Sequence, residues 1–279
     1  MKHNTGRLTD AGDLFQQSWL PQQPATAALL LVHGFGEHSD RYTHVAKYFV
    51  EHGYAVYAVD HDGHGKSPGT PGFVSHFSNY TDGVIALLQQ IREEQPGIPM
   101  FLIGHSMGGL ISAALLLHQQ QDFAGCVLSG PALESDAGPP AWLLAVNRVL
   151  ASIVPRLGML KLDATGVSRD PEVVKKYLAD PLVYKGKLTS RLINEMFRTM
   201  REVSAGAPEV TLPVLIMHGD ADAIVPPSGS QQFYELLGSA DKTLKMYPGL
   251  YHEIFNEPEQ RQVLDDMLAW LEAHRTSTS

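Results

Sequence analysis

The chain has 279 residues, of which 44% are hydrophobic and 18% are charged, so a globular protein with a sizeable core is expected rather than a disordered one. Its formal net charge is −9 and no run of Lys or Arg stands out, which argues against a nucleic-acid partner. The single cysteine, Cys126, excludes an intrachain disulfide. It lies in an apolar run and is expected to be a buried thiol.

No secretory leader and no membrane span are predicted. The first residues, MKHNTGRLTDAGD, are polar where a leader would be apolar. The longest apolar stretch, residues 141–154, contains Asn147 and Arg148, so it is too short and too polar to cross a bilayer. A soluble, cytoplasmic protein is expected, with residues 276–279 as a frayed tail.

The first half of the chain alternates strands with helices. A hairpin is predicted over residues 5–20, with its turn at residues 9–12. Continuous apolar runs then predict buried strands, and apolar residues at helical spacing predict helices between them. The expected strands are 27–32, 54–59, 100–103 and 126–129, and the expected helices are 40–51, 82–94 and one that begins at Met107.

The alternation stops after residue 131 and resumes after residue 205. The later elements are a strand at 214–218, a helix at 228–237, a strand at 243–247 and a helix at 258–274. Repeated strand–helix units imply an α/β fold with a mostly parallel, doubly wound sheet that is covered on both faces. Residues 1–131 and 206–279 are therefore predicted to form one core. Residues 132–205, the cap segment, are predicted to be an inserted and mainly helical cap.

Residues 104–108, Gly-His-Ser-Met-Gly, match the pattern G-x-S-x-G between a predicted strand and a predicted helix. In that motif the chain turns sharply and the serine, here Ser106, stands at the apex. The start of a helix also favours developing negative charge. A glycine-rich turn that merely carries a serine is the alternative, because the pattern also occurs by chance.

Serine is a poor nucleophile unless a histidine, held by a carboxylate, takes its proton. His252 follows the last predicted strand, whereas His274 falls in the terminal helix, so His252 is expected to be the base. Asp220 and Asp222 both follow the strand before it, and either residue is a candidate for the acid. The order Ser, Asp, His along the chain is that of α/β-hydrolases.

Two backbone N–H groups are expected to bind the oxyanion that forms during acyl transfer. Met107, the residue after the serine, should supply one. Phe35, in the loop that follows the strand 27–32, should supply the other.

Cofactor motifs are incomplete in this chain, and no cofactor is expected. Gly34 and Gly36 begin a G-x-G-x-x-G pattern, but Ser39 stands at the third glycine; a P-loop ending at Ser67 would need a glycine at Asp60. The histidines near the predicted site lack the spacing of H-E-x-x-H, so no metal is expected and they are interpreted as lining or bracing the site. They are His33, His38, His61, His64 and His105.

Seven segments, in order along the chain, resemble the monoacylglycerol lipase group of the α/β-hydrolase superfamily. They are HGFGEHSDRY (33–42), DHDGHGKSPG (60–69), GHSMGG (104–109), ADPLV (179–183), HGDAD (218–222), DKTLKMYPGLYHE (241–253) and NEP (256–258). The resemblance implies the α/β-hydrolase fold. It implies Ser106 as nucleophile, His252 as base and Asp222, rather than Asp220, as acid, and it supports Phe35 and Met107 as oxyanion donors.

The resemblance also implies contacts to the alcohol part of a substrate. Glu37 and Arg41 would approach glycerol hydroxyls, and Tyr177 would line the polar pocket. Glu37 and Arg41 could instead form only an ion pair at the start of a helix. Phe35 departs from the smaller residue that related sequences often have, and its ring is expected to narrow or reshape the pocket.

The cap segment carries apolar residues at roughly helical spacing: Trp142, Val146, Val149, Leu150, Ile153 and Leu157. These residues either pack on the core, line an acyl-chain tunnel, or make transient contact with a membrane or micelle surface.

The function predicted is that of a serine hydrolase of lipid carboxylic esters, which cleaves monoacylglycerol to fatty acid and glycerol through an acyl-enzyme. The alternatives are a lysophospholipase, a broad-specificity carboxylesterase, or a catalytically silent lipid-binding relative.

Overall fold

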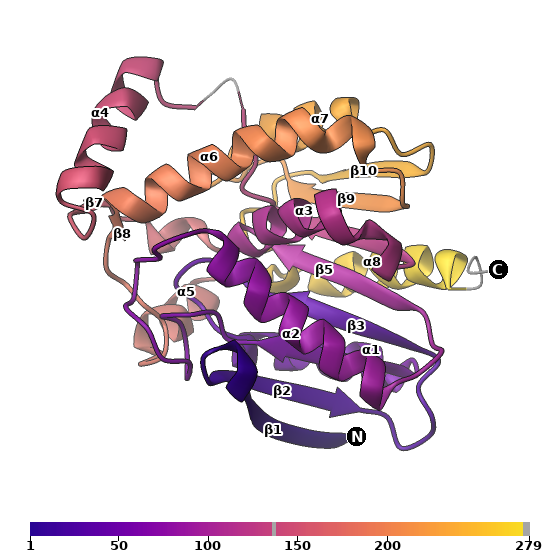
Figure 1. Cartoon of the computed structure of the whole chain (residues 1–279). Helices are drawn as coiled ribbons and strands as arrows, with labels where there is room; N and C mark the ends of the chain where they lie inside the picture. The colour runs from indigo at the N-terminus through magenta and orange to yellow at the C-terminus, as the bar shows by residue number, and fades with distance from the viewer. Residues whose placement is uncertain (136–137, 276–279) are drawn as a thin grey trace.

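An eight-stranded sheet forms the centre of the computed structural model, which describes residues 1–135 and 138–275 (Figure 1). The tail expected to be frayed, residues 276–279, lies outside the described residues. In spatial order the strands are β1 (Lys2–Leu8), β2 (Leu14–Leu20), β4 (Tyr54–Val59), β3 (Ala27–Val32), β5 (Met100–His105), β6 (Gly125–Ser129), β9 (Val214–Gly219) and β10 (Lys242–Tyr247).

The first two strands form the predicted hairpin, which begins at Lys2. Strand β2 pairs antiparallel with both β1 and β4, and all the other neighbours in this sheet pair in parallel. The carboxyl ends of the parallel strands therefore meet at one edge, where binding sites of such sheets form. The prediction of a mostly parallel, doubly wound sheet is confirmed.

Helices cover both faces of the sheet because its central strands are apolar on both sides. In β3, Ala28, Leu30 and Val32 pack into one core cluster, whereas the alternate residues 27, 29 and 31 pack into the other. The first cluster lies under α2 (Ser78–Glu94), α3 (Met107–Gln119) and α7 (Pro227–Leu236), and the second under α1 (Thr43–Glu51) and α8 (Gln260–His274).

Two helices begin three or four residues from their predicted starts, whereas α7 and α8 begin within two residues of theirs. Helix α1 begins at Thr43, after a 3₁₀ turn over Ser39–Tyr42. Asp60 accepts hydrogen bonds from the Ser39 N–H (2.8 Å) and hydroxyl (2.6 Å), and these bonds keep the turn separate from the helix. Helix α2 begins four residues before residue 82. Its first turn is mostly polar, and only the buried Tyr80 marks it as packed.

The cap segment joins β6 to β9 and lies beyond the carboxyl ends of the strands (Figure 1). It contains α4 (Ala141–Ile153), β7 (Gly158–Leu160), α5 (Pro171–Ala179), β8 (Leu188–Thr189) and α6 (Ser190–Gly206). The short antiparallel pair β7–β8 was not predicted, since strands of three and two residues leave no periodic signal. Helix α6 ends one residue beyond the predicted boundary, and the division of core from cap stays a prediction.

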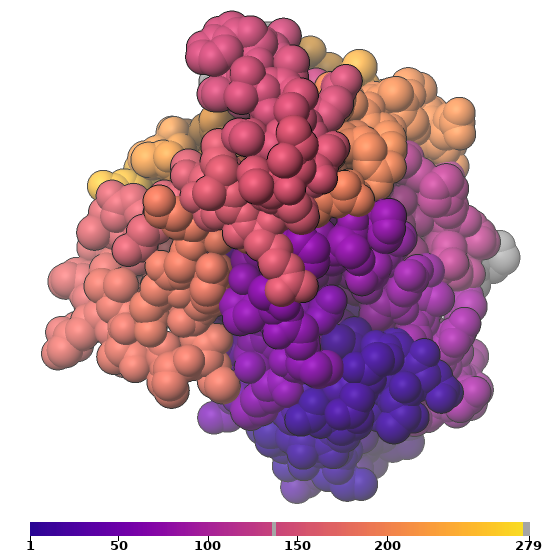
Figure 2. Space-filling view, turned by 60° about the vertical axis from the view of Figure 1, so that its left-hand side comes forward, coloured from indigo at the N-terminus to yellow at the C-terminus, as the bar shows by residue number. Residues whose placement is uncertain are grey.

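Helix α4 faces outward with its apolar side. Its buried residues are Asn147 and Ala151, whereas Trp142 is 68% exposed and Ile153 is 73% exposed. Figure 2 shows this part of the chain projecting from the molecular surface. Packing on the core therefore does not account for these apolar residues. Within residues 1–135 and 138–275, no helix has the length and apolarity that a bilayer span needs.

Candidate active site

Ser106 occupies the sharp turn between β5 and α3. Its backbone is strained, with φ 55° and ψ −119°, and it is only 9% exposed. A Cβ built on Gly108 would lie 2.1 Å from the Val32 carbonyl oxygen, and one on Gly104 would lie 2.5 Å from the Gly108 oxygen. Any larger residue would clash at these positions, so both glycines of the motif are needed to bring the serine to this apex.

His252 and Asp222 form a buried pair in the loops after β10 and β9. The His252 Nδ1–H donates a 2.6 Å hydrogen bond to Asp222 Oδ2. The backbone N–H groups of Ile224 and Val225 donate to Asp222 Oδ1 at 2.8 and 2.9 Å. Because Nδ1 carries the proton, Nε2 of His252 is left as an acceptor. His252 and Ser106 line the same cavity.

The structure separates the two candidate aspartates. Asp222 contacts His252, whereas Asp220 is exposed and accepts a 2.6 Å hydrogen bond from the Gly249 N–H. Asp220 therefore stabilises the loop after β10, as a turn residue does.

His218 is a site residue that the sequence interpretation missed. Its Nε2–H donates to Asp222 Oδ2 at 3.0 Å, and its Nδ1 accepts from the Ser230 hydroxyl at 2.7 Å. The side chain is completely buried, so this hydrogen bond is shielded from water. The available signal was its position four residues before Asp222, in the segment HGDAD, at the end of a buried strand.

Burial and charge act against each other on this pair. Burial favours the neutral acid, but His252 and the hydrogen bonds from His218 and His252 outweigh it and hold the pKa of Asp222 well below its ordinary value. Burial also lowers the pKa of His252, but the adjacent Asp222 outweighs this and raises it above 6.5. The result is an ionised carboxylate beside an imidazole of increased basicity.

The loop that follows β3 passes directly against the serine. A Cβ built on Gly34 would lie 3.1 Å from Ser106 Cβ. Phe35 and Met107, the two predicted oxyanion donors, both line the cavity at Ser106. Within residues 1–135 and 138–275, neither of their backbone N–H groups has a hydrogen-bond acceptor. Both are therefore available to a ligand at this position.

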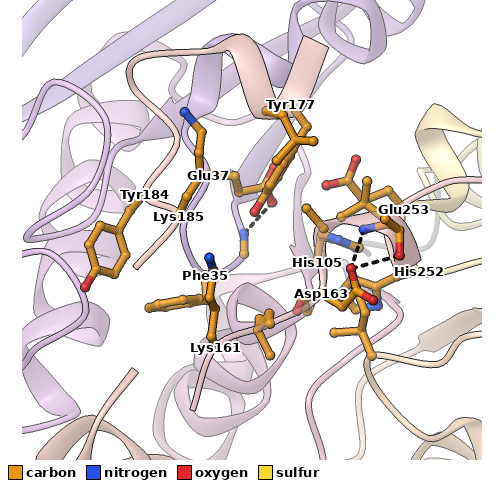
Figure 3. Close-up of a pocket in the computed structure, with 18 of the residues that line it drawn as sticks. Phe35, Glu37, His105, Lys161, Asp163, Tyr177, Tyr184, Lys185, His252 and Glu253 are labelled. Atoms are coloured by element: carbon orange, nitrogen blue, oxygen red, sulfur yellow. Dashed lines mark hydrogen bonds between the residues drawn. The ribbon is translucent and has the colours of Figure 1, made fainter. Parts of the chain in front are cut away.

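The cavity at Ser106 has two lobes that share Ser106 and Phe35. The polar lobe, of about 540 Å³, is lined by Glu37, Tyr177, His252 and Glu253 among others. In Figure 3, His252 and Glu253 lie on one side of this lobe, and Phe35 lies on the other. The apolar lobe, of about 300 Å³, is lined mainly by aliphatic and aromatic side chains from α4, α6, β7 and β8 and from the loop after β6: Leu133, Leu144, Leu160, Leu188, Ile193, Met196, Phe197 and Met200.

Glu37 is held by three donors beneath the polar lobe. Its carboxylate accepts hydrogen bonds from the Gly34 N–H (2.7 Å), the Tyr42 hydroxyl (2.6 Å) and Arg41 (2.7 Å). Burial raises the pKa of Glu37, and the positive charge of Arg41 only partly offsets this effect. Glu37 therefore anchors the loop that carries Phe35, in addition to lining the lobe.

Arg41 makes the ion pair with Glu37 that the sequence allowed, and a second one that was missed. Its guanidinium makes a bidentate pair with Glu253, with both distances 2.6 Å, and stacks 4.7 Å from the centre of the Tyr177 ring. Arg41 lines a neighbouring cavity that shares Tyr177, not the cavity at Ser106. This placement differs from the expectation that Arg41 reaches the alcohol. The only signal in the sequence for Glu253 was its position directly after His252.

Four of the five histidines of this interpretation lie close to one another or to His252. His33, His61 and His64 lie against one another, and the His105 ring lies 4.8 Å from that of His252. Burial, together with the nearby His252, lowers the pKa of His105 to about 3, so it stays neutral beside the base. Among the described residues, no group of three His, Cys, Asp or Glu side chains could hold a metal ion.

A mostly parallel sheet with a strained serine turn and a Ser–His–Asp set at its carboxyl edge defines a serine hydrolase of the α/β-hydrolase fold. A family model described as serine aminopeptidase, S33, matches residues 23–259. The chain belongs to this family.

The similar proteins include monoacylglycerol lipases, which confirms the resemblance of the sequence motifs. The monoacylglycerol lipase of Mycolicibacterium smegmatis is 40% identical, over 92% of this chain and 91% of that protein. The human monoglyceride lipase is 33% identical, over 97% of this chain and 90% of that protein. The crystal structure of Paleococcus ferrophilus monoacylglycerol lipase matches with a TM-score of 0.85 and 34% identity, over 94% of this chain and 99% of that one.

Proposed function

We propose that the protein hydrolyses monoacylglycerols through an acyl-enzyme on Ser106. His252 Nε2 takes the hydroxyl proton of Ser106 as the oxygen attacks the ester carbonyl, and Asp222 stabilises the imidazolium that forms. The backbone N–H groups of Phe35 and Met107 bind the oxyanion. His252 then donates its proton to the leaving glycerol oxygen. Water attacks the acyl-enzyme by the same steps and releases the fatty acid.

The two lobes on either side of Ser106 are the observation that carries this proposal. An acyl chain suits the apolar lobe, whereas glycerol suits the polar lobe, where Glu37 and Tyr177 offer polar groups. Arg41 holds the Glu37 and Glu253 carboxylates in place and acts on the alcohol through them. The names of the similar proteins, monoacylglycerol lipase and monoglyceride lipase, support the same substrate.

The charges of the polar lobe favour a neutral alcohol over a phosphate headgroup. Arg41 carries one positive charge against two buried carboxylates, and its ion pair lowers the pKa of Glu253 although burial acts in the opposite direction. Lys161 and Lys185 also line this lobe, but both are exposed, so water and salt screen their charge. A lysophospholipid would bring its phosphate towards the buried negative charge.

A matched substrate panel tests this choice. We expect 1-oleoylglycerol to have a kcat/KM at least about tenfold above that of 1-oleoyl lysophosphatidylcholine, since one mismatched buried charge costs 1.4 kcal/mol or more. Tyr177→Phe should raise KM for the monoacylglycerol but not for a short nitrophenyl ester, which lacks the glycerol hydroxyls. Faster turnover of the lysophospholipid would contradict the substrate assignment.

We further propose that the cap segment, as a unit distinct from the core, docks on an anionic lipid surface. Its outward apolar side chains include Trp142, Val149 and Ile153, each more than half exposed. Residues 132–205 contain 11 of the chain's 21 Lys and Arg but only 8 of its 30 Asp and Glu. A basic cap on an acidic core orients α4 towards negative charge. The protein would then be peripheral to membranes.

Vesicle sedimentation tests the docking. We expect binding to vesicles that contain anionic lipid, weaker binding to neutral vesicles, and loss of binding in Trp142→Ser/Ile153→Ser. Leu236→Ser is the matched control, because Leu236 is 44% exposed but lies on α7 of the core. Equal binding of the double variant and the control would overturn the proposal.

A further inference from the structure

The chain around residue 167 runs alongside the loop that carries His252. This loop, residues 251–257, forms only the short 3₁₀ turn Ile254–Asn256, so several of its backbone groups need partners from elsewhere. The cap segment supplies them through three hydrogen bonds: His252 N–H to Gly166 C=O (3.4 Å), Glu253 N–H to Val167 C=O (2.8 Å) and Ser168 hydroxyl to Asn256 C=O (3.1 Å).

One buried carboxylate ties these two pieces of chain together. The Glu257 side chain is completely buried, and its Oε1 accepts from the Tyr251 N–H (3.1 Å) and the Arg169 N–H (2.9 Å). Its Oε2 accepts from Arg169 Nε at 2.8 Å. Arg169 also pairs with Glu259. The residue directly before His252 is therefore linked, through one carboxylate, to an arginine of the cap segment.

We infer that Arg169 and Glu257 are a positioning pair that holds His252 in register with Ser106 and Asp222. This inference rests on the proposed function, in which His252 is the base. Asp222 fixes the imidazole of His252 at one end, but the position of its main chain depends on Tyr251 and the contacts of the loop. A displacement of about 1 Å of a reacting group can cost on the order of 100-fold in rate.

The pair also makes the base depend on the cap segment. Ala164, Thr165 and Val167, just before Arg169, line the polar lobe, and Asp170, just after it, caps α5. Helix α5 carries Tyr177 into the same lobe. The stretch that contacts substrate is thus the stretch that holds the histidine loop, so a displaced cap segment would misplace both.

The test compares Arg169→Ala, Arg169→Lys and Glu257→Gln with the control Arg198→Ala. Arg198 pairs with Glu195 and Glu202 on α6 of the cap segment and does not contact the histidine loop. We measure kcat and KM on a soluble nitrophenyl ester, the pH profile, the rate of Ser106 labelling by a fluorophosphonate, and the melting temperature.

We expect Arg169→Ala to lower kcat and the labelling rate by about tenfold or more, with KM changed less than about threefold. Arg169→Lys should restore part of the loss, because it keeps the charge but not the planar donors. Arg198→Ala should stay within about twofold of the wild type. The Arg169 side chain is 33% exposed, whereas that of Glu257 is completely buried. Arg169→Ala is therefore the milder variant, and it keeps the test decisive if Glu257→Gln does not fold.

Two outcomes separate failure of this inference from failure of the proposed function. If Ser106→Ala is inactive but Arg169→Ala keeps the wild-type kcat and pH profile while it melts earlier, the pair is only structural and the inference is overturned. If Ser106→Ala hydrolyses the ester at the wild-type rate, the proposed function falls, and with it the role of His252.

Discussion

Two regions of the molecule differ in how far their side chains are exposed to solvent. One is the set of loops at the carboxyl ends of the core strands, and the other is helix α4 of the cap segment. Ser106, Asp222 and His252 are each at most 9% exposed, and hydrogen bonds hold the Asp222 and His252 side chains. In α4, by contrast, Trp142 and Ile153 are about seven-tenths exposed, and the buried side chains include a polar one, Asn147. The reacting groups are therefore preorganised within the protein, whereas the exposed face of α4 is adapted to something outside it.

If this contrast is right, substitutions in the buried Asp222–His252 pair should cause the largest losses of kcat, and the loss should be the same for every ester. Asp222→Asn should lower kcat by on the order of 10⁴-fold, because an amide no longer stabilises the imidazolium and holds the wrong tautomer. The loss should be equal, within a few-fold, for 1-oleoylglycerol and for nitrophenyl butyrate. A loss confined to one substrate would show that the pair does not act on the reacting atoms of every ester.

A smaller loss of kcat is expected when His218 is replaced, because His218 contacts the Asp222 carboxylate and not the reacting atoms. His218→Ala leaves the Asp222 carboxylate without one of its hydrogen bonds, so we expect kcat to fall by roughly 10- to 100-fold with KM nearly unchanged. The control is His118→Ala, a histidine in the last turn of α3. If both variants keep the wild-type kcat, His218 has no part in positioning the acid.

The pH profile sharpens the description of the buried pair. His252 accepts a proton only when neutral, and Asp222 raises its pKa, so kcat/KM should rise with pH through a midpoint above 6.5. Glu253 also raises this pKa, so Glu253→Gln should move the midpoint to lower pH. Asp265→Asn, which removes an exposed carboxylate of α8, should leave the midpoint in place. A shift to higher pH in Glu253→Gln would contradict the electrostatic description.

The smallest effect on kcat/KM is expected from substitutions in α4, and only when the substrate is presented in anionic vesicles. Trp142→Ser should change kcat/KM for a soluble ester by less than about twofold, because the side chain touches no reacting group. With substrate presented in anionic vesicles, the same variant should lose roughly tenfold, since burying a large apolar side chain contributes about 1.5–3 kcal/mol. Equal losses of kcat/KM in both assays would show that Trp142 affects hydrolysis itself and not binding to the vesicle.

Most of the core could be predicted because its signals are local. Unbroken apolar runs marked β3 and β4 at their observed ends, and the glycines of residues 104–108 marked the serine turn. The order of Ser, Asp and His follows from the fold, so the base could be assigned from position alone. Only the resemblance to a family favoured Asp222 over its neighbour Asp220.

What could not be predicted depends on partners far apart in the sequence. Arg41 pairs with Glu253 across 212 residues, and Arg169 pairs with Glu257 across 88 residues. Periodicity reveals that a helix has an apolar face but not whether that face points to the core or to solvent, which is why α4 was open to three interpretations. Its outward orientation is fixed by tertiary packing, in which Asn147 donates to the Ser190 carbonyl at 3.1 Å.

In the proposed mechanism Ser106, activated by His252 and Asp222, forms the acyl-enzyme. Intact-mass spectrometry with peptide mapping, after treatment with a long-chain fluorophosphonate, identifies the nucleophile. We predict one adduct per chain, located on Ser106, formed far more slowly in His252→Ala and absent in Ser106→Ala, which should also lose its monoacylglycerol hydrolysis. An adduct on another residue, or hydrolysis by Ser106→Ala at the wild-type rate, would contradict this mechanism.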